Sequence, residues 1–425
     1  MISVDNITKF DFETVPIDPF WNIGEEREFK IHRIHAYPAK FPAFITTKAL
    51  EYANWQGHSV KSIADIFCGC GTTAFEARRN NIPFWGCDIN PVATLIAKTK
   101  SRRYQLKRLE NYYQAIINNF EREPISDNYN FERERLKYWY KREQYNDLFH
   151  LKVAILNQTP TGNDYQSFFL CAFSNILKAT SVWLTKSIKP QVDPVKKCAD
   201  VLSSFKKQCK LMFVANEEID SFNNSVSKIV TENFLDEVTS RPRIDMIITS
   251  PPYVTSYEYA DLHQLSSMWL GFTDDYRKLR EGSIGSLHQD YNFSREWKRL
   301  NSSGNKIVSL LLNSDKSKAH SVAKYFLDMQ VVAKKSYKML NSEGIALFVI
   351  GNTEYKGVRI DNAKHLAESL FDAGFSKVLT TKRKISYKIL TPYRDAIGKF
   401  SSNSTGRKIY SEEFIIVGRK LHGKN

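Results

Sequence analysis

The chain has 425 residues, of which 42% are hydrophobic and 13% aromatic, and this size and composition predict a large folded core with one or two further modules. Its formal net charge of +15 favours a polyanionic partner, first of all nucleic acid, because lysines and arginines that neutralise phosphates release condensed counterions. Six cysteines are too few for a disulfide framework, and without an apolar run of membrane-spanning length or a signal pattern at residues 1–8 we expect a cytoplasmic protein.

The first hundred residues alternate between helical and strand periodicity. We expect the following elements there: a helix at 43–52, a strand at 62–67, a glycine turn at 68–71, a helix at 72–80, a strand at 84–88 and a helix at 91–100. Strand, turn, helix, strand and helix form a βαβα unit. Such a unit implies a parallel sheet with right-handed crossovers, and therefore an α/β fold.

The remaining sequence divides into a helical part and a return of the α/β rhythm. Residues 101–225 carry lysine, arginine, glutamate and tyrosine at helical spacing, which predicts a mostly helical insertion. After it we expect strands at 227–231, 244–249, 344–350 and 413–418, and helices at 322–339 and 363–373. Residues 270–318 read as irregular. The α/β domain is therefore expected in two parts, 1–100 and 226–425.

A glycine turn follows the first strand. Gly69-Cys70-Gly71-Thr72-Thr73-Ala74 fits the pattern G-x-G-x-x-A, in which glycine lets the backbone approach a ligand at the helix N-terminus. Asp88 ends the next strand, at the right distance to accept hydrogen bonds from ribose hydroxyls. Together they predict a cofactor that contains adenosine, although the glycine pattern alone also permits NAD(P). The structural alternative is a helix-packing turn with a solvent-facing aspartate.

A second motif, Ser250-Pro251-Pro252-Tyr253, follows a later strand. Two prolines end a strand ladder and form a rigid elbow with outward-pointing carbonyls. Acceptors beside an aromatic ring suit a flat ring that carries an amino group. The structural alternative is a strand stop with a capping tyrosine.

These two motifs resemble those of one enzyme family. The run from Asp65 to Thr73 resembles the D-P-F-x-G-x-G-T-T loop of amino-group DNA methyltransferases, which hold S-adenosylmethionine, and Ser250 to Tyr253 resembles their catalytic tetrad. Serine in first place is typical of cytosine-N4 enzymes, whereas aspartate or asparagine there is typical of adenine-N6 enzymes. Segments 35–42, 254–261, 269–271 and 338–349 are also similar to the family, so the resemblance covers residues 30–100 and 227–420.

The resemblance implies a Rossmann-like mixed sheet of about seven strands flanked by helices. It also implies transfer of a methyl group from S-adenosylmethionine to the N4 amino group of a flipped cytosine in double-stranded DNA. The Ser250 hydroxyl and the Pro251 carbonyl would accept from the amino group, Tyr253 would stack on the base, and Pro252 completes the tetrad. The implied cofactor-binding residues are Tyr37, Lys40, Asp65, Phe67, Gly69, Gly71, Thr72, Thr73, Asp88, Ile89 and Asn233. Glu232-Asn233 departs from the Gly-Asp that the family often has after its third strand.

The expected partners are double-stranded DNA and a cognate restriction endonuclease, in a bacterial or archaeal cytosol. We place DNA reading in residues 254–318, in a loop expected at 380–408 that includes a flexible stretch at 401–406, and on part of the helical insertion. Individual basic runs read as solvated faces that together form a phosphate track: Arg102-Arg103, Lys206-Lys207, Lys334-Lys335 and Lys382-Arg383-Lys384. The alternatives are an adenine-N6 enzyme, a non-catalytic DNA-binding protein that kept the fold and, more distantly, a nicotinamide oxidoreductase.

Two groups of potential metal ligands have simpler interpretations. Cys68, Cys70 and Cys87 lie close in sequence, and we interpret them as reduced buried thiols. His32, His35 and His263 are interpreted as structural or phosphate-contacting residues, since methyl transfer from a sulfonium needs no metal. The expected cofactor is therefore S-adenosylmethionine alone.

Overall fold

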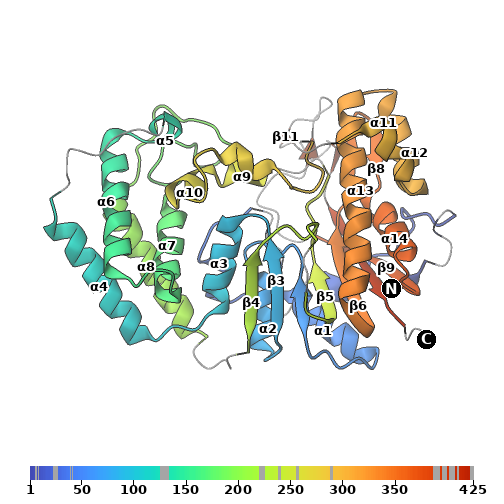
Figure 1. The fold of residues 1–425 in the computed structure, drawn as a ribbon, viewed down its shortest axis with the longest axis horizontal. Helices are drawn as coiled ribbons and strands as arrows, with labels where there is room; N and C mark the ends of the chain where they lie inside the picture. The colour runs from blue at the N-terminus through green and yellow to red at the C-terminus, as the bar shows by residue number, and fades with distance from the viewer. Residues whose placement is uncertain are drawn as a thin grey trace.

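The computed structural model describes residues 1–4, 7, 9–22, 27–38, 40, 42–124, 134–219, 225–237, 241–254, 258–287, 291–385, 393–394, 400–401, 407–408 and 411–421. Figure 1 shows a central sheet with helices packed around it and a further group of helices beyond one sheet edge. None of the helices within the described ranges combines the length and the apolar composition that a membrane-spanning helix needs.

The central sheet has eight strands in the order β1-β9-β13-β6-β5-β2-β3-β4. Their bounds are β1 Ile2–Ser3, β2 Ile63–Asp65, β3 Phe84–Asp88, β4 Ser227–Thr231, β5 Ile244–Thr249, β6 Leu340–Ile350, β9 Lys377–Lys384 and β13 Glu412–Arg419. Strands β6, β5, β2, β3 and β4 pair in parallel, whereas β13 is antiparallel to both β6 and β9, and β1 to β9. The predicted Rossmann-like mixed α/β sheet is confirmed.

Helices cover both faces of this sheet, because alternate strand residues point to opposite sides. They are α1 Phe44–Trp55, α2 Thr72–Arg79, α3 Pro91–Ser101, α13 Lys316–Met339 and α14 Asn362–Asp372. Along β5, Ile247 packs into the core with α13 and α14, while Met246 and Ile248 pack into the core with α1 and α2. The sheet is therefore buried on both faces, as its near-continuous apolar strands require.

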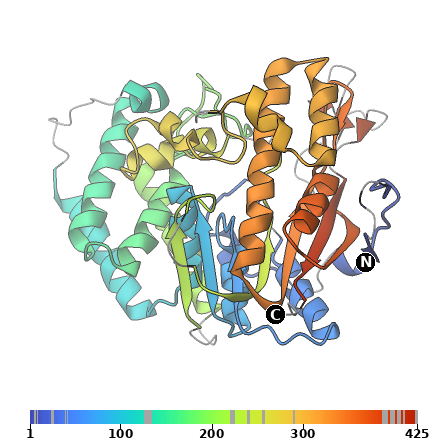
Figure 2. The same ribbon diagram turned by 45° about the vertical axis from the view of Figure 1, so that its right-hand side comes forward.

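Between α3 and β4 the chain is helical, as its spacing predicts. These helices are α4 Leu106–Arg122, α5 Glu134–Trp139, α6 Arg142–Gln158, α7 Asp164–Ile176 and α8 Val201–Glu217. They share a hydrophobic core that also takes in Val92 and Ile96 of α3, so the group is packed against the edge of the α/β part. Figures 1 and 2 both place it to one side of the sheet, beyond β4. Its part in binding DNA stays a prediction.

Shorter elements complete the chain. They are η1 Pro19–Trp21, η2 Lys30–Arg33, α9 Tyr259–Leu262, α10 Gln264–Trp269, η3 Tyr276–Arg280, α11 Phe293–Glu296, η4 Trp297–Arg299, α12 Ser302–Leu312, β7 Thr353–Tyr355, β8 Val358–Ile360, β10 Tyr393–Arg394, β11 Phe400–Ser401 and β12 Arg407–Lys408.

Helix α12 corrects the prediction that residues 270–318 are irregular. Its first turn is polar, which hid the helical period, but the Asn301 side chain caps it by accepting from the Gly304 N–H at 2.9 Å. Ile307, Val308 and Leu311 are buried in the core with α13 and α14. The long helix α13 also begins earlier than expected, at Lys316, because Asp315 provides the cap.

Strand β9 corrects a second prediction, that residues 380–408 form a loop with a solvated basic run. Residues 380–384 belong to β9, which lies between β1 and β13, so neighbouring strands cover it. Lys382 and Arg383 are buried, and Arg383 forms an ion pair of 2.6 Å with Glu413. Most of the remainder of 380–408, and the flexible loop expected at 401–406 apart from residue 401, lie outside the described residues.

Gly71 provides a test of how the glycine turn packs. It has φ +76°, and a Cβ there would lie 2.6 Å from the Ala97 Cα in α3, whereas Gly162 has φ +75° and open space. Gly162→Ala should cost only the left-handed backbone strain, roughly 1–2 kcal/mol. Gly71→Ala should cost a further 1–3 kcal/mol, roughly, from the overlap with α3. Urea unfolding of both variants checks this, and equal losses would show that α3 moves away at no cost.

Candidate functional site

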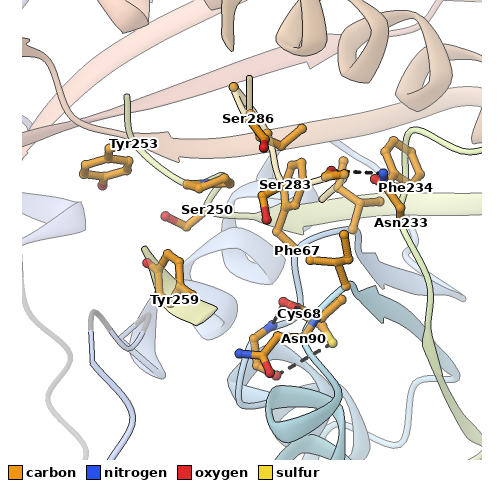
Figure 3. Close-up of a pocket in the computed structure, with 18 of the residues that line it drawn as sticks. Phe67, Cys68, Asn90, Asn233, Phe234, Ser250, Tyr253, Tyr259, Ser283 and Ser286 are labelled. Carbon is orange, nitrogen blue, oxygen red and sulfur yellow. Dashed lines mark hydrogen bonds between the residues drawn. The ribbon is translucent and has the colours of Figure 1, made fainter. Parts of the chain in front are cut away.

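A cavity of about 330 Å³ opens where the parallel strands β2, β3, β4 and β5 end, which is where open α/β sheets bind ligands. It brings both sequence motifs together, although they lie far apart in the chain (Figure 3). The predicted site residues that line it are Tyr37, Lys40, Asp65, Phe67, Gly69, Thr72, Asp88, Ile89, Asn233, Ser250, Pro252 and Tyr253.

Three predicted residues lie outside the lining of this cavity: Gly71, Thr73 and Pro251. Gly71 allows α2 and α3 to pack closely, as described above. The Thr73 hydroxyl donates to Asp65 Oδ2 at 2.8 Å, so Thr73 orients a residue that does line the cavity. Pro251 is buried within the elbow.

Asp65 joins the two motifs at the floor of the cavity. One of its oxygens accepts from the Thr249 hydroxyl at 2.6 Å and from the Phe67 N–H at 3.2 Å. Thr249 directly precedes Ser250, so this bond fixes the tetrad against the glycine loop. Burial raises the pKa of Asp65 to about 6, because it disfavours the charged form.

Asp88 shapes the glycine loop from the end of β3. Its Oδ2 accepts from the Gly69 N–H at 2.9 Å, and its Oδ1 accepts from the Asn90 N–H at 2.9 Å. Burial raises the pKa of Asp88 to about 6. Each oxygen keeps a further lone pair, so a hydroxyl-bearing ligand can still be bound.

The residues after β4, Glu232 and Asn233, replace the Gly-Asp that the family often has, and both make contacts within the protein. Glu232 pairs with Arg241 at 3.1 Å. Asn233 donates to the Gly282 carbonyl at 3.0 Å and accepts from the Leu235 N–H at 3.0 Å, so its side chain holds a neighbouring segment. Its contact with the cofactor stays a prediction.

An apolar wall stands beside Asn233. Phe234 packs edge-on against Phe67, with ring centroids 6.4 Å apart, and both rings line the cavity (Figure 3). This wall suits a flat aromatic ligand group.

Ser250 and Tyr253 of the elbow lie on the opposite side of the cavity from Phe234 (Figure 3). The Ser250 hydroxyl donates to the Val349 carbonyl at 3.0 Å, which leaves its lone pairs for accepting. The Tyr253 hydroxyl donates to Glu413 Oε1 at 2.9 Å. Burial and the Glu413 carboxylate raise the pKa of Tyr253 well above its ordinary value, so this hydroxyl stays a donor.

An aromatic stack forms a further wall; the sequence analysis named Tyr37 and His263 but did not predict that they stack. Tyr37 stacks on His263, with centroids 5.0 Å apart, and on Tyr259 at 6.3 Å. His263 Nδ1 lies 2.7 Å from Asn90 Nδ2, and burial lowers the pKa of His263 to about 4, so the neutral ring accepts this bond. Only the similarity of segments 35–42 and 254–261 to the family pointed to this part of the chain.

A covering segment, residues 282–286, was predicted only as part of the DNA-reading range 254–318, and its place at the cavity was not, because it lies in the stretch that read as irregular. Its residues line the cavity together with Lys318, Ser321 and Tyr325 of α13. The Gly285 N–H donates to Asp328 Oδ2 at 2.9 Å, which ties the segment to α13. The cavity is thus bounded by strand ends, the elbow and α13.

The predicted histidines take separate partners. His32 Nε2 lies 2.9 Å from Glu76 Oε1, and His35 Nε2 lies 2.9 Å from the Ser174 hydroxyl, while His263 faces Asn90. All six cysteines are free thiols, and Cys68, Cys70 and Cys87 are buried. In the part of the chain that the structure describes, no three His, Cys, Asp or Glu residues gather as a metal site.

Comparison with known proteins supplies two relatives. The Type II methyltransferase M.MvaI of Kocuria varians is 23% identical over 406 residues, which cover 88% of this chain and 88% of that protein. This chain is similar to Type II methyltransferases. M.MjaII of Methanocaldococcus jannaschii, also named a Type II methyltransferase, is 32% identical over 95 residues, which cover 22% of this chain and 17% of that protein.

Other comparisons add less. No protein-family model matches the chain. The solved structure of the rRNA methyltransferase aviRa from Streptomyces viridochromogenes aligns over 91% of this chain and 88% of its own, with 9% identity and a TM-score of 0.29. A superposition as loose as this bears on neither fold nor function.

Proposed function

We propose that the protein is an S-adenosylmethionine-dependent DNA methyltransferase that modifies the N4 amino group of cytosine in double-stranded DNA. One observation carries the proposal: the glycine loop with Asp88 and the Ser250 elbow line the same cavity. The similarity to M.MvaI along 88% of both chains supports methyl transfer. The net charge of +15 supports a polyanionic substrate.

The residues of the glycine-loop half fit the cofactor. Asp88 would accept from the ribose hydroxyls with its remaining lone pairs, and Phe67 with Phe234 would contact the adenine ring. Tyr37 and Asp65 would lie toward the methionine end. When bound, S-adenosylmethionine supplies an activated methyl group on a sulfonium.

The elbow half fits a cytosine that has left the duplex. The N4 lone pair is conjugated with the ring, so the amino nitrogen becomes a better nucleophile when acceptors draw on its hydrogens. The Ser250 hydroxyl can accept one of them, because its own hydrogen is held by the Val349 carbonyl. The predicted second acceptor is the Pro251 carbonyl, although Pro251 lies outside the lining of the cavity, and Tyr253 would stack on the base. Holding both partners in line lowers the barrier, by up to roughly 7–11 kcal/mol in favourable systems.

Identification of the methylated nucleoside tests this proposal. The purified protein is incubated with unmethylated duplex DNA and S-adenosylmethionine, the DNA is digested to nucleosides, and the products are identified by mass. We expect N4-methyldeoxycytidine. N6-methyldeoxyadenosine would overturn the choice of base, and tight DNA binding without any methylated nucleoside would show a non-catalytic DNA-binding protein.

We further propose that the protein is the modification enzyme of a restriction-modification system. Sequencing of expression-host DNA for modified cytosines would give the recognition sequence. DNA methylated in this way should resist a cognate endonuclease. Cleavage of fully modified DNA by that endonuclease would contradict this role.

A further inference from the structure

Behind the elbow, Tyr253 is held by residues from two strands on the far side of β6. Its hydroxyl donates to Glu413 Oε1 at 2.9 Å. The other oxygen of Glu413 accepts from Arg383 Nε at 2.9 Å and from a terminal nitrogen of Arg383 at 2.6 Å. One carboxylate oxygen of Glu413 therefore accepts from the neutral Tyr253 hydroxyl and the other from the charged Arg383 guanidinium. These bonds on both oxygens fix the orientation of the carboxylate.

This pair is shielded from solvent. The side chain of Arg383 is 3% exposed and that of Glu413 16%. The Arg383 guanidinium also lies 5.7 Å from the centre of the Phe44 ring. An ion pair in such surroundings is screened little, so it holds its geometry more firmly than a surface pair.

The Tyr253 ring also lies against the end of β6, where a glycine leaves room for it. Gly351 follows the last residue of that strand, and a Cβ there would lie 2.9 Å from Tyr253 Cε2. Only glycine therefore lets the ring lie in its observed place. The hydroxyl of Tyr253 is held by Glu413, and Gly351 leaves the space that the ring edge occupies.

We propose that Glu413 and Arg383 are positioning residues, which hold the Tyr253 ring in the orientation in which it stacks on the target base. The inference rests on the proposed function. A ring that is fixed in advance loses no freedom when the base arrives, so less of the binding free energy is spent on ordering it. Glu413 and Arg383 act through Tyr253 and touch neither the base nor the cofactor.

A double-mutant cycle tests this positioning role. Tyr253→Phe keeps the stacking ring and removes its hydroxyl, while Glu413→Gln removes the charge but still gives Arg383 an oxygen. Each single variant is expected to lower kcat/KM for DNA by about 3- to 10-fold, the loss of one modest hydrogen bond. The double variant should be no worse than Tyr253→Phe alone, because Glu413 would have nothing left to hold.

Two further readouts separate positioning from general stability. A duplex with 2-aminopurine at the target position should show weaker fluorescence enhancement with both single variants, whereas the Kd for S-adenosylmethionine should stay within about twofold of wild type. Tyr140→Phe is the matched control, because its buried hydroxyl donates to the Leu177 carbonyl at 2.9 Å within the helical group. It should leave both readouts unchanged.

The outcomes distinguish this inference from the proposed function. Equal losses from Glu413→Gln in the wild-type and Tyr253→Phe backgrounds would overturn the positioning role, and so would full activity of both single variants. Wild-type protein that methylates no DNA would instead overturn the proposed function. Gly351→Ala gives an independent check, since the added methyl group should displace the ring and lower kcat/KM for DNA without changing cofactor affinity.

Discussion

Replacing Ser250 by alanine is expected to slow methyl transfer about 100-fold or more, the usual loss when one preorganised polar contact to the reacting group is removed. The hydroxyl lies at the cavity, and its hydrogen is already given to the Val349 carbonyl at 3.0 Å. Alanine therefore removes an acceptor from the cavity. Single-turnover transfer of labelled methyl groups to DNA measures the rate.

Cofactor affinity should stay within about twofold of wild type in Ser250→Ala, because the Asp88 half of the cavity is unchanged. Ser62→Ala is the matched control. The Ser62 hydroxyl donates to Asp245 Oδ2 at 3.0 Å. Ser62 directly precedes β2, so it lies at the amino-terminal ends of the parallel strands, whereas the cavity lies at their carboxyl-terminal ends. Ser62→Ala removes a hydroxyl that donates to Asp245 Oδ2 and accepts from the Asp245 N–H, yet only Ser250→Ala should lose activity. Full activity of Ser250→Ala would contradict the proposed catalytic role of Ser250.

The sequence was sufficient where a feature depends on adjacent residues. The bounds of β3 and β5 were predicted to the residue, because each is a short apolar run closed by a polar residue or by proline. The glycine loop and the elbow were found for the same reason. Their meeting in one cavity followed from the rule that parallel strands end at one edge.

The sequence was insufficient where a feature depends on residues far apart. Glu413 lies 160 residues from Tyr253, and nothing near either residue indicates their contact. Arg383 stands in a run of three basic residues that read as solvated, because only the position of β9 between β1 and β13 buries it. The covering segment at 282–286 was missed because glycine and serine carry no periodicity, although α13 orders it.

Replacing Asp88 by asparagine is expected to weaken S-adenosylmethionine binding about 10- to 100-fold, since hydrogen bonds to charged groups contribute about 1.5–3 kcal/mol. Both carboxylate oxygens accept from backbone N–H groups, of Gly69 and of Asn90. An amide must turn its NH₂ toward one of these donors, so the variant disturbs the glycine loop and loses an acceptor for the ribose. Calorimetric titration at pH 7.5 measures the effect.

Asp245→Asn is the matched control for Asp88→Asn. Asp245 accepts from the Lys61 N–H at 2.9 Å and from Asn341 at 2.7 Å, at the opposite edge of the sheet. It should leave cofactor affinity unchanged even if it lowers stability. Equal affinity of the wild type and Asp88→Asn would show that Asp88 only shapes the loop.

The pH dependence separates the proposed cofactor-binding role of Asp88 from its structural role in the glycine loop. Burial raises the pKa of both Asp88 and Asp65 to about 6, so cofactor affinity in the wild type should fall as the pH drops below about 6 and the carboxylates become protonated. The stability of the fold should instead rise as the pH drops. A carboxyl whose pKa is raised on folding contributes stability that is full below its unfolded pKa of about 3.9 and is lost as the pH rises through about 6. Because Asp88→Asn removes one of the two groups, its affinity should depend less steeply on pH than that of the wild type. An equally steep dependence in the variant would assign the titration to Asp65 alone.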